Sequence, residues 1–339
     1  MPFVSFCFTT YKRPDILINT VKSILLQSFH DYEIIISDND PERSGQKITE
    51  TLRDPRIKYF SNESNLGMKK SFNKSLERST GKYIVMIADD DPVYPDMLET
   101  LVDLETKYPG YGMYLGGGDL FCTDPLIGSL YNLQIGTNTK LNNNYPINHI
   151  WKLSGEEFVS GIFRYKLLQN YLWSCGFVKR ELLIEMGGVP DYGTPFLGDY
   201  AYLTIMASHS GGILINRALG HQAIHPENFG RQQNEQLKTA VTGFREYAAE
   251  RFRKNNMPEQ VYINMDKFLG MWVGAQLAFL FNYYKKQNLP LAPLIEAEKE
   301  IYKLPVPKKY YLKYYIKRDY PKLHDWLVMA KKKFSNNQD

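Results

Sequence analysis

Three consecutive aspartates, Asp89, Asp90 and Asp91, directly follow a short apolar run in the chain. The run, Tyr83 to Ile87, is rich in β-branched residues and is preceded by a glycine, which is typical of a strand in the core of a sheet. Three adjacent carboxylates repel one another, so they stay ionised together only when a cation joins them. Their hard oxygen atoms suit Mg²⁺ or Mn²⁺, with positions left for water and substrate phosphate. A solvated acidic turn better explains an isolated triplet, but the preceding strand and the residues below favour a cation site.

Strands and helices alternate around these carboxylates. Apolar runs predict strands over residues 2–8, 32–36, 56–60 and 83–87. Helical spacing of apolar residues, with Pro14 at a first helical position, predicts helices over residues 14–25, 45–52 and 69–77. This order is typical of an α/β fold with a mainly parallel sheet, helices on its faces and right-handed crossovers.

The carboxyl ends of the four predicted strands carry polar side chains. These are Thr9 to Tyr11, Asp38, Asn62 to Asn65 and Asp89 to Asp91. Ligands of open parallel sheets bind beyond the carboxyl ends of the strands, so we expect all four groups to meet in one crevice. No G-x-G-x-x-G follows the first strand and no G-x-x-x-x-G-K-[ST] occurs, which argues against a Rossmann dinucleotide site and a P-loop.

Composition describes an ordinary globular protein of 339 residues, with 43% apolar and 23% charged residues. A net charge of +4 is too small to indicate a nucleic-acid partner. Three cysteines far apart in sequence fit buried thiols in a reducing cytoplasm. The N-terminus lacks the apolar core of a signal peptide, and the longest apolar stretch, residues 268–281, is too short to span a bilayer. We therefore expect a cytoplasmic protein.

Several segments together resemble the family 2 glycosyltransferases of the GT-A fold. They are TTYKRP from Thr9, EIIISDND to Asp40, NLGMKKSFN from Asn65, GKYIVMIADDDPVYPDML from Gly81 and GFVKRELLIEMGG to Gly188. Each segment is weak alone, but their order and spacing carry the resemblance over about the first two thirds of the chain. It implies transfer of a sugar from a nucleoside diphosphate sugar, with a divalent metal (Mn²⁺ or Mg²⁺) and inversion at the anomeric carbon.

The resemblance also implies roles at the strand ends. Asp38 would hydrogen-bond the base, Thr10 and Tyr11 would lie against the nucleotide, and Lys69 and Lys70 would face the diphosphate unless they are simply solvated. A turn that leads into a helix would explain Asn65 and Gly67 without a ligand. The predicted nucleotide-binding residues are Thr9, Thr10, Tyr11, Arg13, Asp38, Asn65, Gly67, Lys70 and Asp89.

The register of the acidic motif leaves two alternatives. A literal D-x-D gives Asp89 and Asp91, whereas counting back from Pro95 gives Ala88 and Asp90. We favour Asp90 as the metal ligand, Asp89 near the ribose and Asp91 close to the metal. The resemblance implies a third metal or diphosphate contact from a histidine after a later strand. We favour His225 for it, with His221 as the alternative, and expect Arg231 in a flap over the donor.

An inverting transfer needs a carboxylate that takes the proton of the acceptor hydroxyl. The family carries an acidic pair before a helix here, and this chain has Gly198 followed by Asp199. Asp199 is the candidate base, and an N-cap of the helix over residues 202–209 is the alternative. Because Ala88 and Gly198 depart from the family pattern, a degenerate glycan-binding scaffold remains a rival. A nucleotidyltransferase that makes the sugar nucleotide is a second rival, but TTYKRP is not its glycine-rich loop.

The middle of the chain gives weaker signals. Gly116 to Asp119 is expected as a tight connection or as backbone near the substrates, and residues 123–150 as an irregular loop on the acceptor side. A helix is predicted over residues 158–172, a strand over residues 173–178 and an edge strand over residues 212–216.

From residue 232 the composition becomes helical, so we divide the chain into a catalytic domain, residues 1–231, and a helical C-terminal region, residues 232–339. Helices are predicted over residues 236–253 and 259–286. The Tyr- and Lys-rich end either packs on the catalytic domain or meets anionic lipid and a lipid-linked glycan acceptor at the inner face of the cell membrane. The tyrosines could also bury one another in an oligomer. The expected pathway is bacterial surface polysaccharide biosynthesis.

Overall fold

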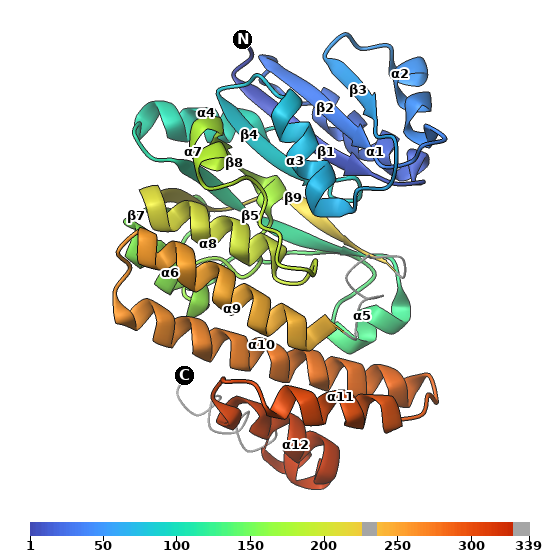
Figure 1. The fold of residues 1–339 in the computed structure, drawn as a ribbon, viewed down its shortest axis with the longest axis vertical. Helices are drawn as coiled ribbons and strands as arrows, with labels where there is room; N and C mark the ends of the chain where they lie inside the picture. Colours follow the sequence, from blue (N-terminus) through green and yellow to red (C-terminus); the bar gives the residue numbers. More distant parts are fainter. Residues whose placement is uncertain (226–235, 328–339) are drawn as a thin grey trace.

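The computed structural model describes residues 1–225 and 236–327 of the chain. Their nine strands form one sheet, drawn in Figure 1, in the order β3-β2-β1-β4-β8-β5-β9-β7, with β6 paired to β5. The bounds are β1 Val4–Thr10, β2 Tyr32–Asp38, β3 Ile57–Ser61, β4 Tyr83–Ala88, β5 Met113–Cys122, β6 Gly136–Asn138, β7 Ile150–Leu153, β8 Gly176–Lys179 and β9 Gly212–Ile224.

The predicted α/β fold with a mainly parallel sheet is confirmed. Strands β3, β2, β1 and β4 pair in parallel, and β5 pairs in parallel with β9. Strand β8 runs antiparallel to both β4 and β5, so β5 and β9 point the same way as the first four strands. The carboxyl ends of the first four strands therefore lie along one edge, with Thr9 opposite Ala88 and Thr10 opposite Asp38.

Side-chain alternation divides the core between the two faces of the sheet. Val4, Phe6 and Phe8 of β1 pack with α1 (Pro14–Leu25) and α4 (Met97–Lys107) on one face. Cys7 of the same strand packs with α3 (Met68–Arg78) on the other face, where the core continues into α6 (Gly155–Phe163) and α8 (Gly198–Ser210). The candidate site described below lies on this second face, between the sheet and the helices that follow α6 in the chain.

The glycine triplet at residues 116–118 lies inside β5, so the predicted tight connection is wrong. A β-carbon at Gly116 would lie 2.5 Å from Leu219 and 2.9 Å from the Arg217 carbonyl oxygen, and one at Gly118 would overlap Leu172. The register of β5 against β9 shifts on both sides of Gly117. Glycine here lets the side chains of neighbouring elements approach the strand, and Asp119 accepts hydrogen bonds from Tyr94 and Lys140 instead of capping a helix.

Three other predictions in the middle region need correction. Helix α6 ends at Phe163 instead of continuing to residue 172, because Tyr165 adopts a positive φ and the chain turns there. Strand β9 runs on to Ile224 and lies between β5 and β7, so it is not an edge strand. Residues 123–150 contain α5 (Pro125–Tyr131), whose N-cap is the side chain of Asp124, and strand β6.

Three of the remaining helices lie close to the ranges predicted over residues 45–52, 236–253 and 259–286. Arg180–Glu185 forms α7, and Ser44–Gln46 and Lys47–Leu52 form a short 3₁₀ turn and α2. Near the C-terminus, α9 spans Leu237–Lys254 and α10 spans Glu259–Lys286. Helix α11 (Ala292–Tyr302) was not predicted, and α12 (Leu312–Asp319) follows the 3₁₀ turn Lys308–Tyr311. The lysine triplet at residues 331–333 lies outside the described residues.

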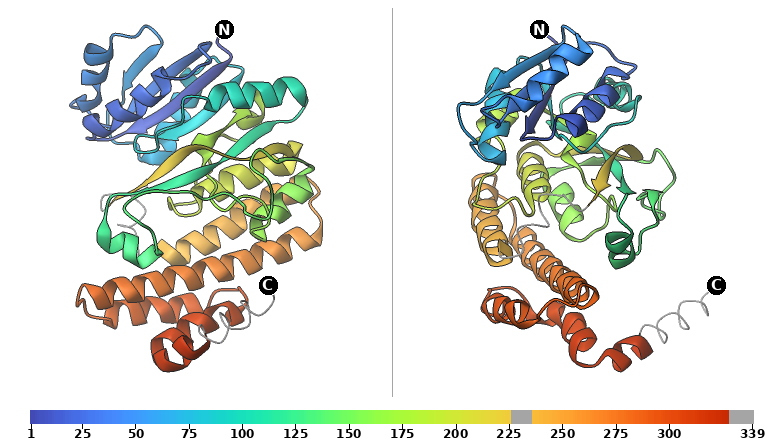
Figure 2. Two further views of the ribbon diagram at one scale, coloured as in Figure 1. Left: turned by 180° about the vertical axis from the view of Figure 1, so that it is seen from behind. Right: turned by 90° about the vertical axis from the view of Figure 1, so that its right-hand side faces the viewer.

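Helices α9 and α10 lie alongside α6 and α8, below the sheet in Figure 1, and Figure 2 shows α11 and α12 beyond them. The buried stripe of α10, which includes Phe268, Leu269, Val273 and Leu277, belongs to the same core as α6 and α8. None of the helices described in the structure is long and apolar enough to cross a bilayer. The predicted domain boundary at residue 231 stays a prediction.

Candidate active site

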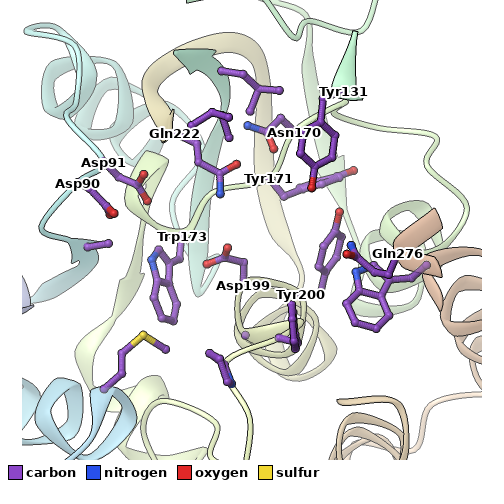
Figure 3. A pocket seen from close by; sticks show the side chains of 18 of the residues that line it. Asp90, Asp91, Tyr131, Asn170, Tyr171, Trp173, Asp199, Tyr200, Gln222 and Gln276 are labelled. Carbon is purple, nitrogen blue, oxygen red and sulfur yellow. The ribbon is translucent and has the colours of Figure 1, made fainter. Parts of the chain in front are cut away.

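A cavity of about 530 Å³ opens where β4 ends, between the carboxylates and α10. Its lining includes Arg13, Asp90, Asp91 and Asp199, and its opposite side consists mainly of aromatic residues. In Figure 3, Asp90 and Asp91 lie on one side of this cavity and Gln276 on the other, with Asp199 between them in that view. The structure thus brings together carboxylates that are more than 100 residues apart in the sequence.

Asp89 and Arg13 form the buried side of the acidic motif. Asp89 accepts a hydrogen bond from the Thr10 hydroxyl at 2.9 Å and from Nε of Arg13 at 3.2 Å, and a second guanidinium nitrogen pairs with its other oxygen. The same guanidinium donates to Asp90 at 3.1 Å. Burial raises the pKa of Asp89, and Arg13 counteracts this rise. Arg13, predicted to bind nucleotide, therefore also neutralises two of the three carboxylates.

Asp90 and Asp91 face the cavity. Nε2 of His225, which directly follows β9, lies 3.2 Å from Asp90, and the backbone amide of Ala223 donates to Asp91 at 3.3 Å. Burial acts to raise the pKa of Asp90, but His225 and Arg13 outweigh it and lower that pKa overall. The pKa of Asp91 is raised well above its usual range by burial and by the charges of Asp90 and Asp199. Among the described residues, no cation compensates Asp91 as Arg13 and His225 compensate Asp90.

The alternative histidine, His221, lies within β9 and away from Asp90. Its ring packs against Phe121, at 5.3 Å between centroids, and against Tyr94, and burial lowers its pKa. The structure thus places His225, and not His221, against the acidic motif. Arg231 lies outside the described residues.

Asp199 lies in the first turn of α8 and reaches the cavity. The N-cap position is Leu197, so Asp199 is not the cap of this helix. Burial raises the pKa of Asp199 to about 7, while Lys69 and a backbone hydrogen bond from Trp173 act in the opposite direction. A carboxylate that titrates near neutral pH is suited to accept a proton during catalysis.

Lys69 is buried on α3 close to Asp199. Its ammonium group donates to the carbonyl of Pro190 at 2.8 Å and lies over the ring of Tyr192. Burial lowers the pKa of Lys69 to about 8, and Asp191 and Asp199 act to raise it. Lys69 and Lys70 were both predicted to face the diphosphate or to be simply solvated; the structure buries Lys69 and leaves Lys70 exposed.

The other predicted nucleotide residues lie at or near the same edge of the sheet. Thr9 is buried at the end of β1, and the following Tyr11 is exposed. Asp38 is buried and accepts hydrogen bonds from the amides of Asp40 and Gly45 and from the Tyr59 hydroxyl. These bonds give it a role in holding the loop after β2.

Asn65 and Gly67 form a local turn before α3. The side-chain oxygen of Asn65 accepts a hydrogen bond from the amide of Gly67 at 2.9 Å, and Gly67 has a φ of 78°. Glycine adopts this backbone conformation without strain. The turn accounts for both residues without a ligand, as the sequence allowed.

The aromatic side of the cavity was missed by sequence reasoning. It is built from Tyr131, Tyr171, Trp173, Phe196, Tyr200, Trp272 and Phe279, with the amide of Gln276. These residues come from α5, the segment before β8, α8 with its preceding loop, and α10. The richness in aromatic residues between positions 158 and 172 was the one available signal, but it could not reveal which rings face a common cavity.

Among the described residues, no group of three His, Cys, Asp or Glu side chains is arranged to hold a metal ion. Mg²⁺ and Mn²⁺ ions are often held by only one or two carboxylates together with water and substrate phosphates. Asp90 and Asp91 on the cavity are two such carboxylates, with the His225 imidazole beside them. The donor set therefore fits a divalent cation that binds together with a phosphate ligand.

Comparison with solved structures shows the fold. TarS of S. aureus in complex with UDP-GlcNAc is 12% identical with a TM-score of 0.53, covering 85% of this chain and 88% of that one. The mannosyltransferase PcManGT of Pyrobaculum calidifontis, in complex with GDP-Man and Mn²⁺, is 16% identical with a TM-score of 0.51, covering 100% of this chain and 88% of that one. Both likenesses agree with the GT-A type of fold predicted from the sequence.

Two relatives in sequence each match a little more than half of the chain. The GalNAc(5)-diNAcBac-PP-undecaprenol beta-1,3-glucosyltransferase of Campylobacter jejuni is 29% identical over 186 residues, which are 53% of this chain and 58% of that protein. The glucosyl-dolichyl phosphate glucuronosyltransferase of Haloferax volcanii is 30% identical over 197 residues, 57% of this chain and 56% of that protein. The match thus spans little more than half the length of either relative.

The family model described as glycosyl transferase family 2 matches residues 5–182. That stretch runs from β1 into α7 and includes Arg13, Asp38 and the whole acidic motif. Since it covers more than half of the 339 residues, the chain belongs to the glycosyl transferase family 2.

Proposed function

We propose that this protein is a metal-dependent, inverting glycosyltransferase that moves one sugar from a nucleoside diphosphate sugar to a hydroxyl of a glycan or lipid-linked acceptor. The observation that carries the proposal is that Asp199, a carboxylate with a pKa of about 7, shares one cavity with Asp90 and Asp91. The two functions that inverting transfer needs, proton removal and stabilisation of the leaving diphosphate, thus have separate groups on one cavity.

Asp90, Asp91 and His225 would hold a Mn²⁺ or Mg²⁺ ion together with the donor diphosphate. When bound, the ion supplies positive charge to the leaving diphosphate. Arg13 adds a cation on the same side, because it already pairs with Asp89 and Asp90. The structure of PcManGT is a complex with both GDP-Man and Mn²⁺, which supports the use of a divalent metal with a sugar nucleotide here.

The nucleotide would lie along the carboxyl ends of β1, β2 and β4, where the predicted residues gather. The end of β1 carries Thr9 and Thr10, and Tyr11 follows it. Asp89 follows β4 and accepts a hydrogen bond from Thr10. Asp38 would hydrogen-bond the base. Its three hydrogen bonds within the protein hold the side chain and the loop after β2 in place. Asn65, Gly67 and Lys70 complete the proposed set from the segment that opens α3.

Asp199 would act as the base in a single displacement. Its carboxylate takes the proton of the acceptor hydroxyl as that oxygen forms a bond to the anomeric carbon of the donor. The bond from this carbon to the diphosphate oxygen breaks at the same time, and the diphosphate leaves with the electron pair. Because the oxygen attacks opposite the leaving group, the configuration of the anomeric carbon is inverted.

The proposal is tested first with nucleotides and then with donors. UDP, GDP, CDP and dTDP are each added with and without Mn²⁺ to the wild type and to Asp90→Asn, and the melting temperature is measured. We expect one nucleotide to raise it only with metal, and only in the wild type, because a ligand that binds the folded state stabilises it by mass action. The absence of a shift for every nucleotide in the wild type would withdraw the proposal.

The catalytic step is tested with the sugar nucleotide of the base so identified. Asp199→Asn should bind this donor as tightly as the wild type but lose its slow hydrolysis and its transfer to acceptor by about 10³-fold, since the general base is absent. Hydrolysis and transfer that survive in Asp199→Asn would assign the base to another residue.

The acceptor and its location form the finer part of the proposal. Both relatives are named for lipid-linked substrates, which supports a lipid-linked acceptor. The pathway that we propose, bacterial surface polysaccharide biosynthesis, rests on the family resemblance. Tyr320, Leu323, Trp326 and Leu327 are exposed near the end of the described chain. Exposed aromatic and aliphatic residues of this kind suit a peripheral contact with the inner face of the cell membrane.

Liposome flotation tests this contact. The wild type should float with vesicles that contain anionic lipid, and a Trp326→Ala, Leu327→Ala double variant should not. Flotation that is independent of anionic lipid, or equal for both proteins, would remove the membrane from the proposal.

A further inference from the structure

The cavity continues well beyond the carboxylates, to a wall formed by α10. Trp272, Gln276 and Phe279 lie at positions i, i+4 and i+7 of this helix, so they share one face. All three line the same cavity as Asp199. The helix thus contributes a strip of three side chains to a site whose carboxylates come from the sheet and α8, and we refer to this strip as the α10 wall.

The aromatic rings around the α10 wall are held by one another. Phe279 stacks on Tyr131 of α5, with ring centroids 4.7 Å apart and an interplanar angle of 20°. Trp272 meets Phe196 edge-to-face, with centroids 5.6 Å apart. These contacts fix ring faces and edges at the cavity before any ligand arrives, which reduces the entropy that binding costs.

Further rings of the cavity are fixed by internal hydrogen bonds. The hydroxyl of Tyr171 accepts a bond from the amide of Leu168 at 3.0 Å, and the hydroxyl of Tyr200 is bonded to Tyr165. In contrast, the amide of Gln276 makes no side-chain hydrogen bond to the part of the chain that the structure describes, although it is only partly exposed. An amide in this position can both donate and accept.

Charge separates the two ends of the cavity. Among the described residues that line it, Arg13 is the one cation, and it pairs with Asp89 and Asp90 at the far end. The α10 wall carries no charge. A phosphate group at this end would find no cation and no array of donors among the described lining residues, which favours a neutral occupant.

We infer that the α10 wall is the acceptor-sugar subsite, in which a neutral pyranose ring packs its C–H face against Trp272 and Phe279 and bonds its hydroxyls to Gln276. This rests on the proposed function, because it takes the carboxylate end of the cavity for the donor. A pyranose has one face of C–H groups and a rim of hydroxyls, which matches aromatic rings beside an unpaired amide. A purely aliphatic chain would bury the Gln276 amide without a partner.

Binding of simple sugars tests the inference directly. The probes are the methyl glycosides of glucose, galactose, N-acetylglucosamine and N-acetylgalactosamine. Their binding to the full chain is measured by saturation-transfer NMR in the presence of the stabilising nucleotide and Mn²⁺. We expect at least one glycoside to bind. Trp272→Ala and Gln276→Leu should each weaken its Kd about tenfold or more.

Ile263→Ala is the matched control, since Ile263 is an exposed residue of α10 that does not line the cavity. It should bind the glycoside as the wild type does. Gln276→Leu keeps the size of the side chain, so it guards against a loss of binding that reflects unfolding of the Trp272 variant. The nucleotide-dependent rise in melting temperature reports that each variant is folded.

The outcomes separate this inference from the proposed function. If donor hydrolysis and nucleotide binding are present but no glycoside binds, or if binding is insensitive to both α10 variants, the acceptor subsite is overturned and the proposed function stands. Preferential binding of a short prenyl phosphate at the α10 wall would also overturn it. If nucleotide binding itself is absent, the proposed function is the one that fails.

Discussion

The ammonium group of Lys69 fills the space beside Gly198, where a β-carbon would lie 3.2 Å from Nζ. The residue before the candidate base therefore has no side chain, and a buried cation from α3 takes that place. The departure from an acidic pair at positions 198 and 199 is thus accompanied by a lysine near the remaining carboxylate. We therefore expect Lys69 to act on Asp199 through its charge, which lowers the pKa of that carboxyl.

Replacing Lys69 by Met should shift the pH dependence of transfer. The base must be deprotonated to act, so kcat of the wild type should rise as pH increases through about 7, the pKa of Asp199. Loss of the Lys69 charge removes an interaction that lowers this pKa, so the midpoint should move up by about 1 unit. The measurement is kcat between pH 5.5 and 9, with Lys74→Met, an exposed lysine of the same helix, as the control. Equal midpoints in Lys69→Met and the wild type would contradict the role.

Asp199→Asn should change how stability depends on pH. The folded-state pKa of about 7 lies above the ordinary value of 3.8, so burial disfavours the charged form. The stability that a neutral carboxyl contributes is complete below about pH 4 and is lost as pH rises through 7. Relative to the wild type, the variant should therefore gain on the order of 3 kcal/mol between pH 5 and pH 8. Urea unfolding in EDTA at both pH values measures this, and a pH-independent difference would argue against a buried titrating Asp199.

Arg13→Gln should destabilise the metal-free protein and be rescued by metal. Without the guanidinium, Asp89 and Asp90 keep their charges with less compensation, which should cost on the order of 2 kcal/mol at pH 7.5 in EDTA. Added MnCl₂ should restore most of the loss, because the ion replaces the missing positive charge. Arg217→Gln removes a more exposed ion pair with Asp96 and should cost less than about 1 kcal/mol, with no rescue. Rescue of both variants, or of neither, would count against a cation site at the acidic motif.

The glycines of β5 should differ sharply in their tolerance of substitution. Gly116→Ala should lower the free energy of unfolding by about 2 kcal/mol, since the new methyl group meets Leu219 and the Arg217 carbonyl. Gly117→Ala is the control, because its nearest neighbours lie at 3.6 Å or more and leave room for a methyl group. Chemical denaturation of both variants measures their free energies of unfolding. A loss at Gly117 as large as that at Gly116 would show that backbone flexibility, and not packing, requires these glycines.

The sequence predicted the elements whose signals are local. Helix α1 and strand β4 were found almost residue by residue, because an apolar period and a proline or glycine boundary lie within each. Strand β5 was missed, because its glycines are required by close packing against Leu219 and Leu172. These two residues lie 50 to more than 100 positions away in the sequence. No local pattern records such a contact.

The candidate site divides in the same way. Asp90, Asp199 and His225 were predicted from their places near strand or helix ends and from the family resemblance. The structure brings Asp90 and Asp199 to one cavity, with His225 beside Asp90. The burial of Lys69 and the aromatic side of the cavity were not foreseen. Which of two adjacent lysines is buried, and which rings share a cavity, depends on how α3, α5, α8 and α10 meet in space.

Helix α10 carries two sets of side chains along its length. One, including Phe268, Val273 and Leu277, is buried in the core shared with α6 and α8, and the other is the α10 wall. Trp272 and Phe279 of the wall also pack against that core, whereas the Gln276 amide faces the cavity without belonging to it. If the wall binds the acceptor as inferred, position 276 is where acceptor preference can change during evolution at the least cost in stability.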